Sequence, residues 1–560
     1  MSRLTETCLR LENQKRPQLF THWHEQENRC ERISGAAFFE QVNRMASALQ
    51  KKYPAQSRIL LLFEPGLGFP LAFWACLKAG MVAVPTYPPA DPRTRQRFLE
   101  IAKDAQASAV LTSEKILKKF QWIRYLLSSL RRMKWHALEE LCQEAIIELA
   151  PAKETDLALL QYTSGSTASP RGVMLSHANV YANASALAAP WKLMPAIQEH
   201  FVSWLPLYHD MGLMCGVIFP LYTGAASTLF SPLYFLQKPR RWLQVLSETQ
   251  GTISAAPNFA YELCLKKITP DQLEGLDLSN WRVTLNGAEA IQAETLQAFS
   301  ERFSTVGFKS NCFYNAYGLA ETTVFVAGGK PLSEPRIHRF SSQALSQNRI
   351  VPDPEGRALV GLGQVWEDTQ LQIVNPDSLT TCAENEIGEI WLQGSSVGMG
   401  YWHKTEQTEA TFSAQLADHP EQGKWLRTGD LGFVYQGDLF ITGRIKELII
   451  LQGQNHSPPL IEKAVQTASD AFRKGCGAAF STGEAPERLI LVQEIKKDCS
   501  LSHAELEKIA KKALAESEGL RLDILYPIEA GSLPKTSSGK IQRNQVKQLY
   551  LKGKLKAWKK

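Results

Sequence analysis

Between residues 59 and 317, short apolar runs alternate with longer stretches of helical periodicity. Such alternation is typical of parallel sheets covered by helices. The first series predicts strands over 59–63, 81–84 and 109–112, with a helix over 71–79. The second series predicts strands over 201–205, 226–230, 252–256, 283–286 and 313–317. We therefore expect an α/β fold whose large N-terminal part contains two doubly wound subdomains.

The rest of the chain has a different pattern of predicted strands and helices. At 560 residues the chain exceeds a single core, since domains average about 150 residues. From about residue 361 the strands become shorter, and residues 433–441 predict a hairpin, so we expect a small β-barrel-like subdomain over about 361–442. Helical patterns at 460–470 and 503–516 and a strand at 489–492 predict a small, mobile α+β C-terminal domain. The expected domains are 1–445 and 446–560.

Composition excludes several classes of protein. With 44% hydrophobic and 21% charged residues, the chain is neither disordered nor fibrous. The longest apolar stretch, 71–84, is interrupted by Lys78 and Gly80 and falls short of the ~20 residues of a membrane span. The first residues contain no apolar signal-peptide core, and the ten cysteines are scattered without a Cys-x-x-Cys pair. We expect a cytoplasmic protein without transmembrane segments.

One loop, YTSGSTASPRGVM at 162–174, places hydroxyls and glycines between a predicted buried strand, 157–160, and a helix expected to begin near Ser176. Gly165 and Gly172 allow backbone amides to turn toward an anion. Additional donors are Ser164, Ser166 and Thr167. The stretch taken by itself fits a phosphate-binding loop and an ordinary polar loop equally well.

The loop is not that of a P-loop NTPase. The Walker pattern requires a glycine, four residues, and then Gly-Lys-Ser/Thr. At Gly539 and Lys540, the only suggestive pair, Pro534 occupies the place of the first glycine and Ile541 follows the lysine. A different phosphate-binding family is therefore expected.

The 162–174 loop resembles the signature loop of the adenylate-forming superfamily, which contains acyl-CoA synthetases, luciferases and peptide-synthetase adenylation domains. Four further segments match in family order, namely NAYGLAET (315–322), RTGD (427–430), GRIKE (443–447) and LPKTSSGKIQR (533–543). Within the superfamily, WLPLYHDMGL (204–213) and APNFAY (256–261) look like the fatty acyl-AMP ligase branch. The resemblance covers nearly the whole chain. The loop departs from the common pattern at Ala168, where glycine is usual, and at Arg171, where lysine is usual.

The resemblance implies an ATP site. Small residues allow close approach to adenine, and an aromatic ring offers a stacking surface. The carboxylate of Asp430 can accept both ribose hydroxyls, with Arg444 assisting, although a turn residue and a surface cation are the alternatives. The positions assigned to ATP and AMP are Thr163, Ser164, Gly165, Ser166, Thr167, Gly287, Ala288, Glu289, Asn315, Ala316, Tyr317, Gly318, Asp430 and Arg444.

The resemblance also implies a catalytic lysine and a metal ligand. Lys540 corresponds to the residue that bridges the substrate carboxylate and the α-phosphate, where negative charge accumulates. Glu321 corresponds to a Mg²⁺ ligand beside the phosphates. The alternatives are a solvated surface lysine and an exposed glutamate at a helix start.

The acyl substrate is assigned to a second group of residues. His209 falls where the family places a residue that guards the acyl carbonyl, so it is a catalytic candidate, and the alternative is a histidine satisfied inside the fold. Gly212 and Asn258 complete the expected acyl site, and Lys446 lies where the superfamily has its interdomain hinge.

Between Glu321 and Gly361 lie 39 residues, where relatives that make acyl-CoA have a shorter connection. We expect a branch-specific insertion over about 327–356, in which segments 336–340 and 349–351 are candidates for a hairpin. The resemblance implies that it restricts rotation of the C-terminal domain. A neutral surface loop is the alternative, because long insertions cost little loop-closure entropy.

The expected function is ATP-dependent activation of a medium- or long-chain fatty acid to acyl-AMP with release of pyrophosphate. The acyl group then passes to the phosphopantetheine thiol of an acyl carrier protein associated with a polyketide or peptide synthase. The alternatives are a fatty acyl-CoA synthetase that uses free coenzyme A and a non-catalytic adenylate- or lipid-binding protein. Retention of Lys540, Glu321 and Asp430 argues against a non-catalytic protein.

Residues 501–560 contain 13 Lys or Arg against 6 Asp or Glu. A basic C-terminal domain would steer an acidic carrier protein toward the site, whereas a solvated tail is the equally weighted alternative. Nucleic-acid binding is not expected, because no stacking platform or groove-reading helix accompanies the charge.

Overall fold

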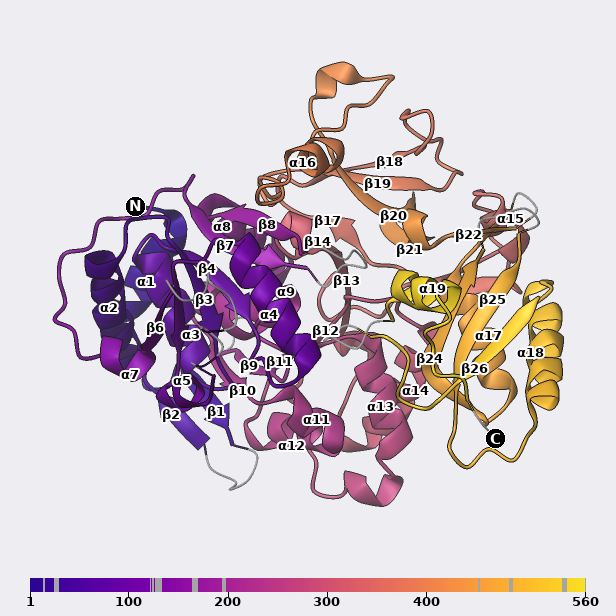
Figure 1. Cartoon of the computed structure of the whole chain (residues 1–560), viewed down its shortest axis with the longest axis horizontal. Helices are drawn as coiled ribbons and strands as arrows, with labels where there is room; N and C mark the ends of the chain where they lie inside the picture. The colour runs from indigo at the N-terminus through magenta and orange to yellow at the C-terminus, as the bar shows by residue number, and fades with distance from the viewer. Residues whose placement is uncertain are drawn as a thin grey trace.

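The computed structural model describes residues 1–13, 16–24, 30–120, 122, 125, 133–163, 170–193, 198–451, 454–482, 487–535 and 541–558. Two large sheets with their helices form most of the molecule, and a small antiparallel sheet and a C-terminal α+β unit follow in the chain (Figure 1). The expected α/β fold class is confirmed.

The first large sheet has six strands in the order β6-β5-β3-β4-β7-β8, parallel except for β8. Leu60 and Leu62 pack in one core with Phe98 of α4 (Pro92–Asp104), whereas Ile59 and Leu61 face a second core. Because both faces of the sheet are buried, the strands read as continuous apolar runs. The strands are β3 (Arg58–Leu62), β4 (Val82–Thr86), β5 (Ala109–Thr112), β6 (Lys134–Ala137), β7 (Leu157–Tyr162) and β8 (Gly172–Ser176).

The second large sheet has nine strands in the order β17-β14-β13-β12-β11-β9-β10-β1-β2. Its strands β13 to β1 in this order are parallel, and the antiparallel strands β14, β17 and β2 lie toward its edges. The strands are β1 (Phe20–Trp23), β2 (Cys30–Ile33), β9 (His200–Ser203), β10 (Ala226–Leu229), β11 (Ile253–Ala256), β12 (Val283–Asn286), β13 (Phe313–Gly318), β14 (Phe325–Gly328) and β17 (Gln364–Val365).

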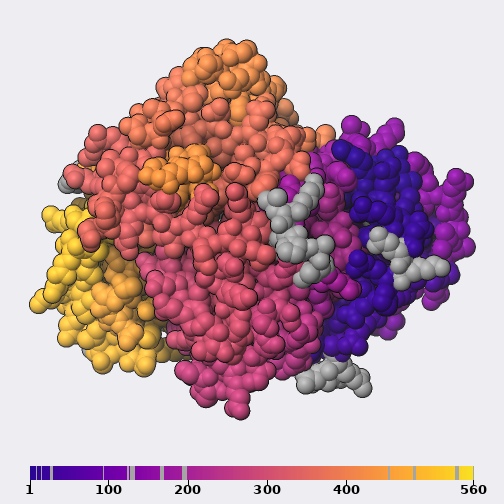
Figure 2. Space-filling view, turned by 180° about the vertical axis from the view of Figure 1, so that it is seen from behind, coloured from indigo at the N-terminus to yellow at the C-terminus, as the bar shows by residue number. Residues whose placement is uncertain are grey.

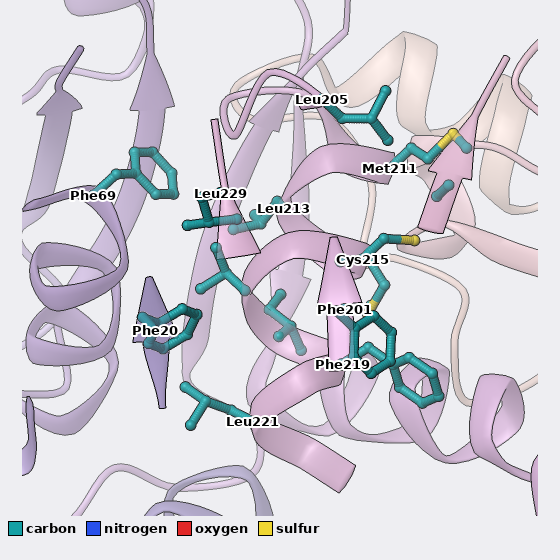
Figure 3. Packing of buried hydrophobic residues seen from close by; sticks show 14 of the residues in the cluster. Phe20, Phe69, Phe201, Leu205, Met211, Leu213, Cys215, Phe219, Leu221 and Leu229 are labelled. Atoms are coloured by element: carbon teal, nitrogen blue, oxygen red, sulfur yellow. The ribbon is translucent and has the colours of Figure 1, made fainter. Parts of the chain in front are cut away.

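The two large sheets share an apolar core. In Figure 3, Phe20 of β1 and Phe69 of α3 belong to the same cluster as Leu213 and Phe219, which flank a π-helix at Met214–Ile218. The shared core joins the two doubly wound units into one body. The surrounding helices are α1 (Arg3–Asn13), α2 (Gly35–Lys52), α3 (Gly68–Lys78), α5 (Glu114–Phe120), α7 (Leu138–Leu141), α8 (His177–Ala188), α9 (Asp210–Leu213), α10 (Phe219–Thr223), α11 (Pro232–Gln237), α12 (Arg240–Glu248), α13 (Asn258–Lys267) and α14 (Ala293–Phe303).

A four-stranded antiparallel sheet, β18-β19-β20-β21, follows in the chain. The predicted hairpin over 433–441 is confirmed, because β20 and β21 pair up to Tyr435 and Asp438. Gln436 and Gly437 both have positive φ, 50° and 83°, as a two-residue type I′ turn requires. The elements are β18 (Gln370–Val374), β19 (Gly388–Gln393), α16 (Thr405–Phe412), β20 (Leu426–Tyr435) and β21 (Asp438–Arg444).

The insertion contains a hairpin whose main strand partner differs from the predicted one. Strand β15 (Ile337–Phe340) pairs along its length with β16 (Arg357–Val360). The predicted partner segment reaches only the end of β15, where Phe340 bridges to Pro352 and the Ser341 amide donates to the Val351 carbonyl at 2.8 Å. Helix α15 (Ser342–Ser346) takes up the chain directly after β15, and Pro352 supplies no N–H to extend the bridge into a ladder. Phe340 then packs against Phe433 of β20 in the core beneath the hairpin.

The C-terminal unit is an α+β layer. Strands β24, β25 and β26 form a sheet that packs with helices α17 and α18. The predicted helices at 460–470 and 503–516 and the predicted strand at 489–492 are confirmed. The elements are β22 (Ile449–Leu451), β23 (Gln454–His456), α17 (Pro458–Ala468), β24 (Phe472–Ser481), β25 (Leu489–Ile495), α18 (His503–Glu518), β26 (Ile524–Ile528) and α19 (Arg543–Leu551).

Two further features concern the described helices and cysteines. None of the helices in the described ranges combines the length and the hydropathy needed to cross a membrane. The nine cysteines whose side chains are described are free thiols, and those at 76, 215, 264, 312 and 476 are buried. A buried free cysteine packs as a small hydrophobic residue.

Candidate active site

The predicted adenine residues lie at the carboxyl ends of two neighbouring parallel strands. Asn286 at the end of β12 is in register with Asn315 of β13, so the segments 287–289 and 316–318 are adjacent. A Cβ on Gly287 would lie 2.8 Å from the carbonyl oxygen of Ala316, which only glycine accommodates without a shift. The crevice outside the carboxyl ends of such strands is where open α/β sheets bind ligands.

Two buried asparagines of these strands have amide atoms without hydrogen-bond partners among the described residues. Asn286 is 0% exposed and both its amide atoms are unpaired, and Asn315 is 4% exposed with an unpaired Oδ1. A buried polar group without a partner costs about 1–3 kcal/mol, so these amides fit a site that a polar ligand completes. Asn286 was missed from the sequence, although it directly precedes the predicted Gly287.

Asp430, Arg444 and Tyr317 form one cluster. Asp430 is 3% exposed; its Oδ1 accepts from Arg444 Nε at 2.5 Å, and its Oδ2 accepts from the Tyr317 hydroxyl at 2.6 Å. The Asp430 charge raises the pKa of Arg444 above its usual range, and burial, with Asp430 adding to it, raises the pKa of Tyr317. The Asp430 carboxylate is therefore paired with a cation on one oxygen and a hydroxyl donor on the other.

A buried glutamate orders the turn that carries Asp430. Glu389 of β19 is buried; its Oε2 lies 2.7 Å from Arg427 Nη2, and its Oε1 accepts from the Gly429 amide at 3.0 Å. The Asp430 amide donates to Thr428 Oγ1 at 3.0 Å. Glu389 was missed because no motif marks it, and its role depends on a strand pairing between β19 and β20.

Glu321 is held beside the stem of the signature loop. Its Oε1 accepts from the Tyr401 hydroxyl at 2.7 Å, and Arg171 lies over the Tyr401 ring, 5.6 Å from its centroid. The segment after Gly398 pairs with β8, since Met174 N donates to Gly400 O at 2.8 Å. Burial, followed by the charge of Glu321, raises the pKa of Tyr401. Tyr401 was also missed from the sequence.

The backbone is strained at two points of the site. Thr323, two residues after Glu321, has φ of 70°, and Ala288 has φ of 67°. Positive φ is unusual for any residue with a side chain and more so for a β-branched one. The Thr323 hydroxyl donates to the Ser396 carbonyl at 3.0 Å, so tertiary contacts hold this conformation.

The structure places the signature loop differently from the sequence-based expectation. Helix α8 does start after Ser176, which is its N-cap, but β8 lies between the loop and the helix. The loop therefore joins two antiparallel strands, β7 and β8, and not a strand to a helix. Thr163 lies at its start, where its carbonyl accepts from Arg97 Nη2 at 2.8 Å. The predicted Ser164, Gly165, Ser166 and Thr167 lie outside the described residues.

The predicted acyl-site residues fall into two places. The Gln161 amide at the end of β7 donates to the Tyr208 carbonyl at 3.0 Å, which brings His209 next to the loop stem. His209 Nδ1 lies 2.5 Å from Asp210 Oδ1. A Cβ on Gly212 would lie 2.1 Å from the Pro206 carbonyl oxygen, so glycine permits the tight turn behind His209.

Asn258 and Glu289 connect α13 with the loop before α14. Asn258 is buried; its Oδ1 accepts from the Gln292 amide at 3.1 Å, and its Nδ2 donates to Glu262 Oε1 at 2.9 Å. Glu289 Oε1 accepts from the Phe259 amide at 2.6 Å, at the N-terminus of α13. These bonds give both side chains a scaffolding role, and their contact with a substrate stays a prediction.

Lys446 lies in a short 3-10 turn, Ile445–Glu447, directly after Arg444. The neighbouring Glu447 pairs with Arg543 at 2.8 Å, and Arg543 also pairs with Glu462 of α17 at 2.7 Å. Arg543 ends the predicted 533–543 motif, so this network connects the motif with the expected hinge. Lys540, within that motif, lies outside the described residues.

The fold and this arrangement of side chains define an adenylate-forming ligase. The chain belongs to the AMP-binding enzyme family, which is matched over residues 12–402. Residues 446–560 match a second description, the AMP domain of Disco-interacting protein 2-like proteins. The resemblance stated from the motifs is thereby confirmed.

Similar proteins of known name cover almost the whole chain. The medium-chain fatty-acid acyl-carrier-protein ligase JamA of Moorena producens (strain JHB) is 40% identical over 93% of this chain and 90% of its own length. The long-chain fatty-acid AMP ligase FadD23 of Mycobacterium tuberculosis (strain CDC 1551 / Oshkosh) is 36% identical over 94% and 92%. A fatty acyl-adenylate ligase from Legionella pneumophila, in complex with acyl adenylate and pyrophosphate, is 32% identical with a TM-score of 0.75, covering 98% and 96%.

Proposed function

We propose that this enzyme converts a medium- or long-chain fatty acid and ATP to acyl-AMP and pyrophosphate, and then transfers the acyl group to an acyl carrier protein. The observation that carries the proposal is the site itself, where the Asp430 cluster, Asn286 and Asn315 lie at the carboxyl edge of β12 and β13. The names of the similar proteins support the same substrate class.

We propose one orientation of the nucleotide in this site. Adenine would lie against the 287–289 and 315–318 segments, where glycine allows close backbone approach and the asparagine amides offer edge contacts. The ribose hydroxyls would bind Asp430, exchanging with or adding to its Tyr317 and Arg444 contacts. The triphosphate would then extend toward the signature loop and Glu321.

Glu321 fits a Mg²⁺ ion. Carboxylate oxygens are the hard ligands that Mg²⁺ takes, and an ionised carboxylate has roughly four lone-pair sites, of which Tyr401 uses one. When bound, Mg²⁺ would neutralise charge on the phosphate oxygens. The role of Tyr401 and Arg171 in this account is to fix the orientation of the Glu321 carboxylate.

The first half-reaction needs no general base. A carboxylate oxygen of the fatty acid attacks the α-phosphorus, the new P–O bond forms, and the bond to pyrophosphate breaks. Lys540 would stabilise the negative charge that gathers on both reacting groups. His209 would lie at the acyl carbonyl. Release of pyrophosphate when fatty acid is added to the enzyme and ATP tests this half-reaction directly, and no release above the ATP-only control would contradict it.

In the second half-reaction the phosphopantetheine sulfur attacks the acyl carbonyl, its thiol proton is lost, and AMP leaves. We propose a synthase-associated carrier protein as acceptor, supported by the carrier-protein acceptor in the name of JamA. The excess of positive charge in residues 501–560 suits an acidic partner. We also propose that the reaction takes place in the cytoplasm.

We further propose that the chain divides into domains 1–445 and 446–560, with rotation at Lys446 between the half-reactions. Some contacts across the boundary are exposed, since Lys463 of α17 donates to Gln292 and lies 3.2 Å from Glu294. Such exposed contacts contribute little and can exchange as a domain rotates.

Lys446→Pro is expected to retain adenylation and to lose transfer to the carrier protein. Proline fixes φ at its own position and restricts the preceding residue, so it limits the backbone change that a hinge needs. Single-turnover assays of each half-reaction measure the effect, with Lys446→Ala as the matched control that removes the side chain alone. Equal losses in both half-reactions of the proline variant would show damage to the fold instead.

The insertion contacts both sides of this proposed hinge. Phe340, Leu345 and Ile350 pack in a core that Ile445 and Leu448 join from the hinge itself. Asn348 accepts from Asn455 of β23 at 3.0 Å, and Arg357 interacts electrostatically with Glu518 at the end of α18. Figure 2 shows the C-terminal unit, in yellow, lying against the surface formed by the middle of the chain. We propose that the insertion restricts rotation of the C-terminal unit through these contacts.

Shortening the insertion is expected to let the enzyme make some acyl-CoA while adenylation persists. Because Phe340 and Arg357 are the last register pair of β15 and β16, residues 341–356 can be replaced by an Asn-Gly turn that keeps this hairpin. Product analysis with free coenzyme A measures the result, and Asn348→Ala tests the single contact. A folded, adenylating variant that gives no acyl-CoA would contradict the restricting role.

A further inference from the structure

Three potential metal ligands meet at the hairpin of β1 and β2, on the edge of the nine-stranded sheet. His22 of β1 is directly opposite Glu31 of β2 in the strand register, and His24 lies two residues after His22. Side chains two residues apart on an extended chain point to the same side. One ligand atom from each of the three residues lies within 4.8 Å of the others.

The local contacts bring these groups together. The His22 and His24 rings are 4.3 Å apart and nearly perpendicular, and His24 Nε2 lies 3.7 Å from Glu31 Oε2. The His22 side chain is buried, at 8% exposed, whereas His24 and Glu31 reach the surface. The loop after β3 lies close by, since a Cβ on Gly66 would be 3.7 Å from His22 Nδ1.

We propose that His22, His24 and Glu31 bind one divalent transition-metal ion, of which Zn²⁺ is the best match. Two imidazoles and a carboxylate are a common zinc ligand set, and tetrahedral bonds of about 2.1 Å place ligand atoms roughly 3.4 Å apart. The ligand atoms lie somewhat farther apart than this, and the His24 and Glu31 side chains, 44% and 58% exposed, have room to rotate toward the ion.

The ion has a structural role distinct from the proposed Mg²⁺ at Glu321. In the sheet order, β11, β9 and β10 separate β1 from β12, where the nucleotide residues lie. A metal bound here would connect the end of β1 to the edge strand β2. It would thereby stabilise the pairing of these two strands, which otherwise depends on backbone hydrogen bonds.

Zinc titration of the full-length, untagged protein after chelator treatment tests the proposal, with Co²⁺ absorption as a second reading of coordination. Wild type is expected to bind one equivalent of Zn²⁺, and His24→Ala and Glu31→Gln are expected to lose about 10-fold or more in affinity. Both sites of substitution are partly exposed, so the fold should survive. The midpoint of thermal unfolding should rise with Zn²⁺ in wild type and much less in the variants.

His419→Ala is the matched control, because His419 also pairs with a glutamate, Glu421, at 3.2 Å. This control should bind zinc as wild type does. Fatty-acid adenylation should be unchanged in all variants, since none of these residues belongs to the proposed nucleotide or acyl site. Wild type that binds less than one equivalent, or His24→Ala that binds as tightly as wild type, would overturn the proposal.

Discussion

Lys540→Ala is expected to reduce the rate of acyl-AMP formation by about 10²–10³, since that is the typical loss when one preorganised charge donor to a transition state is removed. Lys540 lies in the 533–543 motif that matches the superfamily, within a segment whose last residue, Arg543, is anchored to Glu447 and Glu462. Transfer from preformed acyl-AMP should change much less, because the carboxylate and α-phosphate no longer need to be brought together.

The control for Lys540 is Lys552→Ala, which removes an exposed lysine after α19 in the same unit. Pyrophosphate release under saturating ATP and fatty acid measures the first half-reaction, and loss of preformed acyl-AMP measures the second. Near wild-type adenylation by Lys540→Ala would show that the lysine is a solvated surface residue, which was the alternative from the sequence.

Asp430→Asn is expected to raise KM for ATP by roughly 10- to 150-fold, because a hydrogen bond to a charged group is worth about 1.5–3 kcal/mol. Asparagine keeps the shape but removes the charge that Arg444 pairs with, and it replaces one acceptor by a donor. KM for the fatty acid should change less, since Asp430 lies on the ribose side of the proposed site.

Asp438→Asn is the matched control for this change. Asp438 is also a buried carboxylate of the β20–β21 hairpin and pairs with an arginine, Arg336, at 3.1 Å, but it lies at the other end of the hairpin. If both variants lose stability equally and KM for ATP stays at the wild-type value in Asp430→Asn, Asp430 is a structural residue and not a nucleotide ligand.

The strands that the sequence predicted well are those buried on both faces. The predictions over 109–112 and 283–286 agree with β5 and β12 to the residue. Continuous apolar runs bounded by polar residues identify such strands without knowledge of their neighbours. The strands β1 and β2 were missed because Thr21, His22 and Glu31 interrupt any apolar pattern. Their place in the sheet depends on the register of Phe20 with Ser227, a distant pairing.

Motifs located the candidate site, and distant contacts supplied its remaining members. Asp430 and Arg444 belong to separate motifs, and the structure brings them together because they are opposite each other in the β20–β21 register. Glu389 and Tyr401 carry no motif; each acts by contacting a residue that does, through strand pairings that a single sequence does not specify. The main partner of β15 was missed for the same reason, because β16 lies beyond α15 in the chain and the nearer candidate segment reaches only the end of β15.

Identification of the products by mass spectrometry tests the central claim most directly. The enzyme is incubated with ATP and a chain-length series of fatty acids, alone, with coenzyme A, or with a phosphopantetheinylated acyl carrier protein. We predict that acyl-AMP forms with medium or long chains in all three mixtures and that a thioester forms only on the carrier protein. Rapid formation of acyl-CoA would contradict the acyl-AMP ligase assignment, and absence of acyl-AMP with every fatty acid would contradict the proposed activity itself.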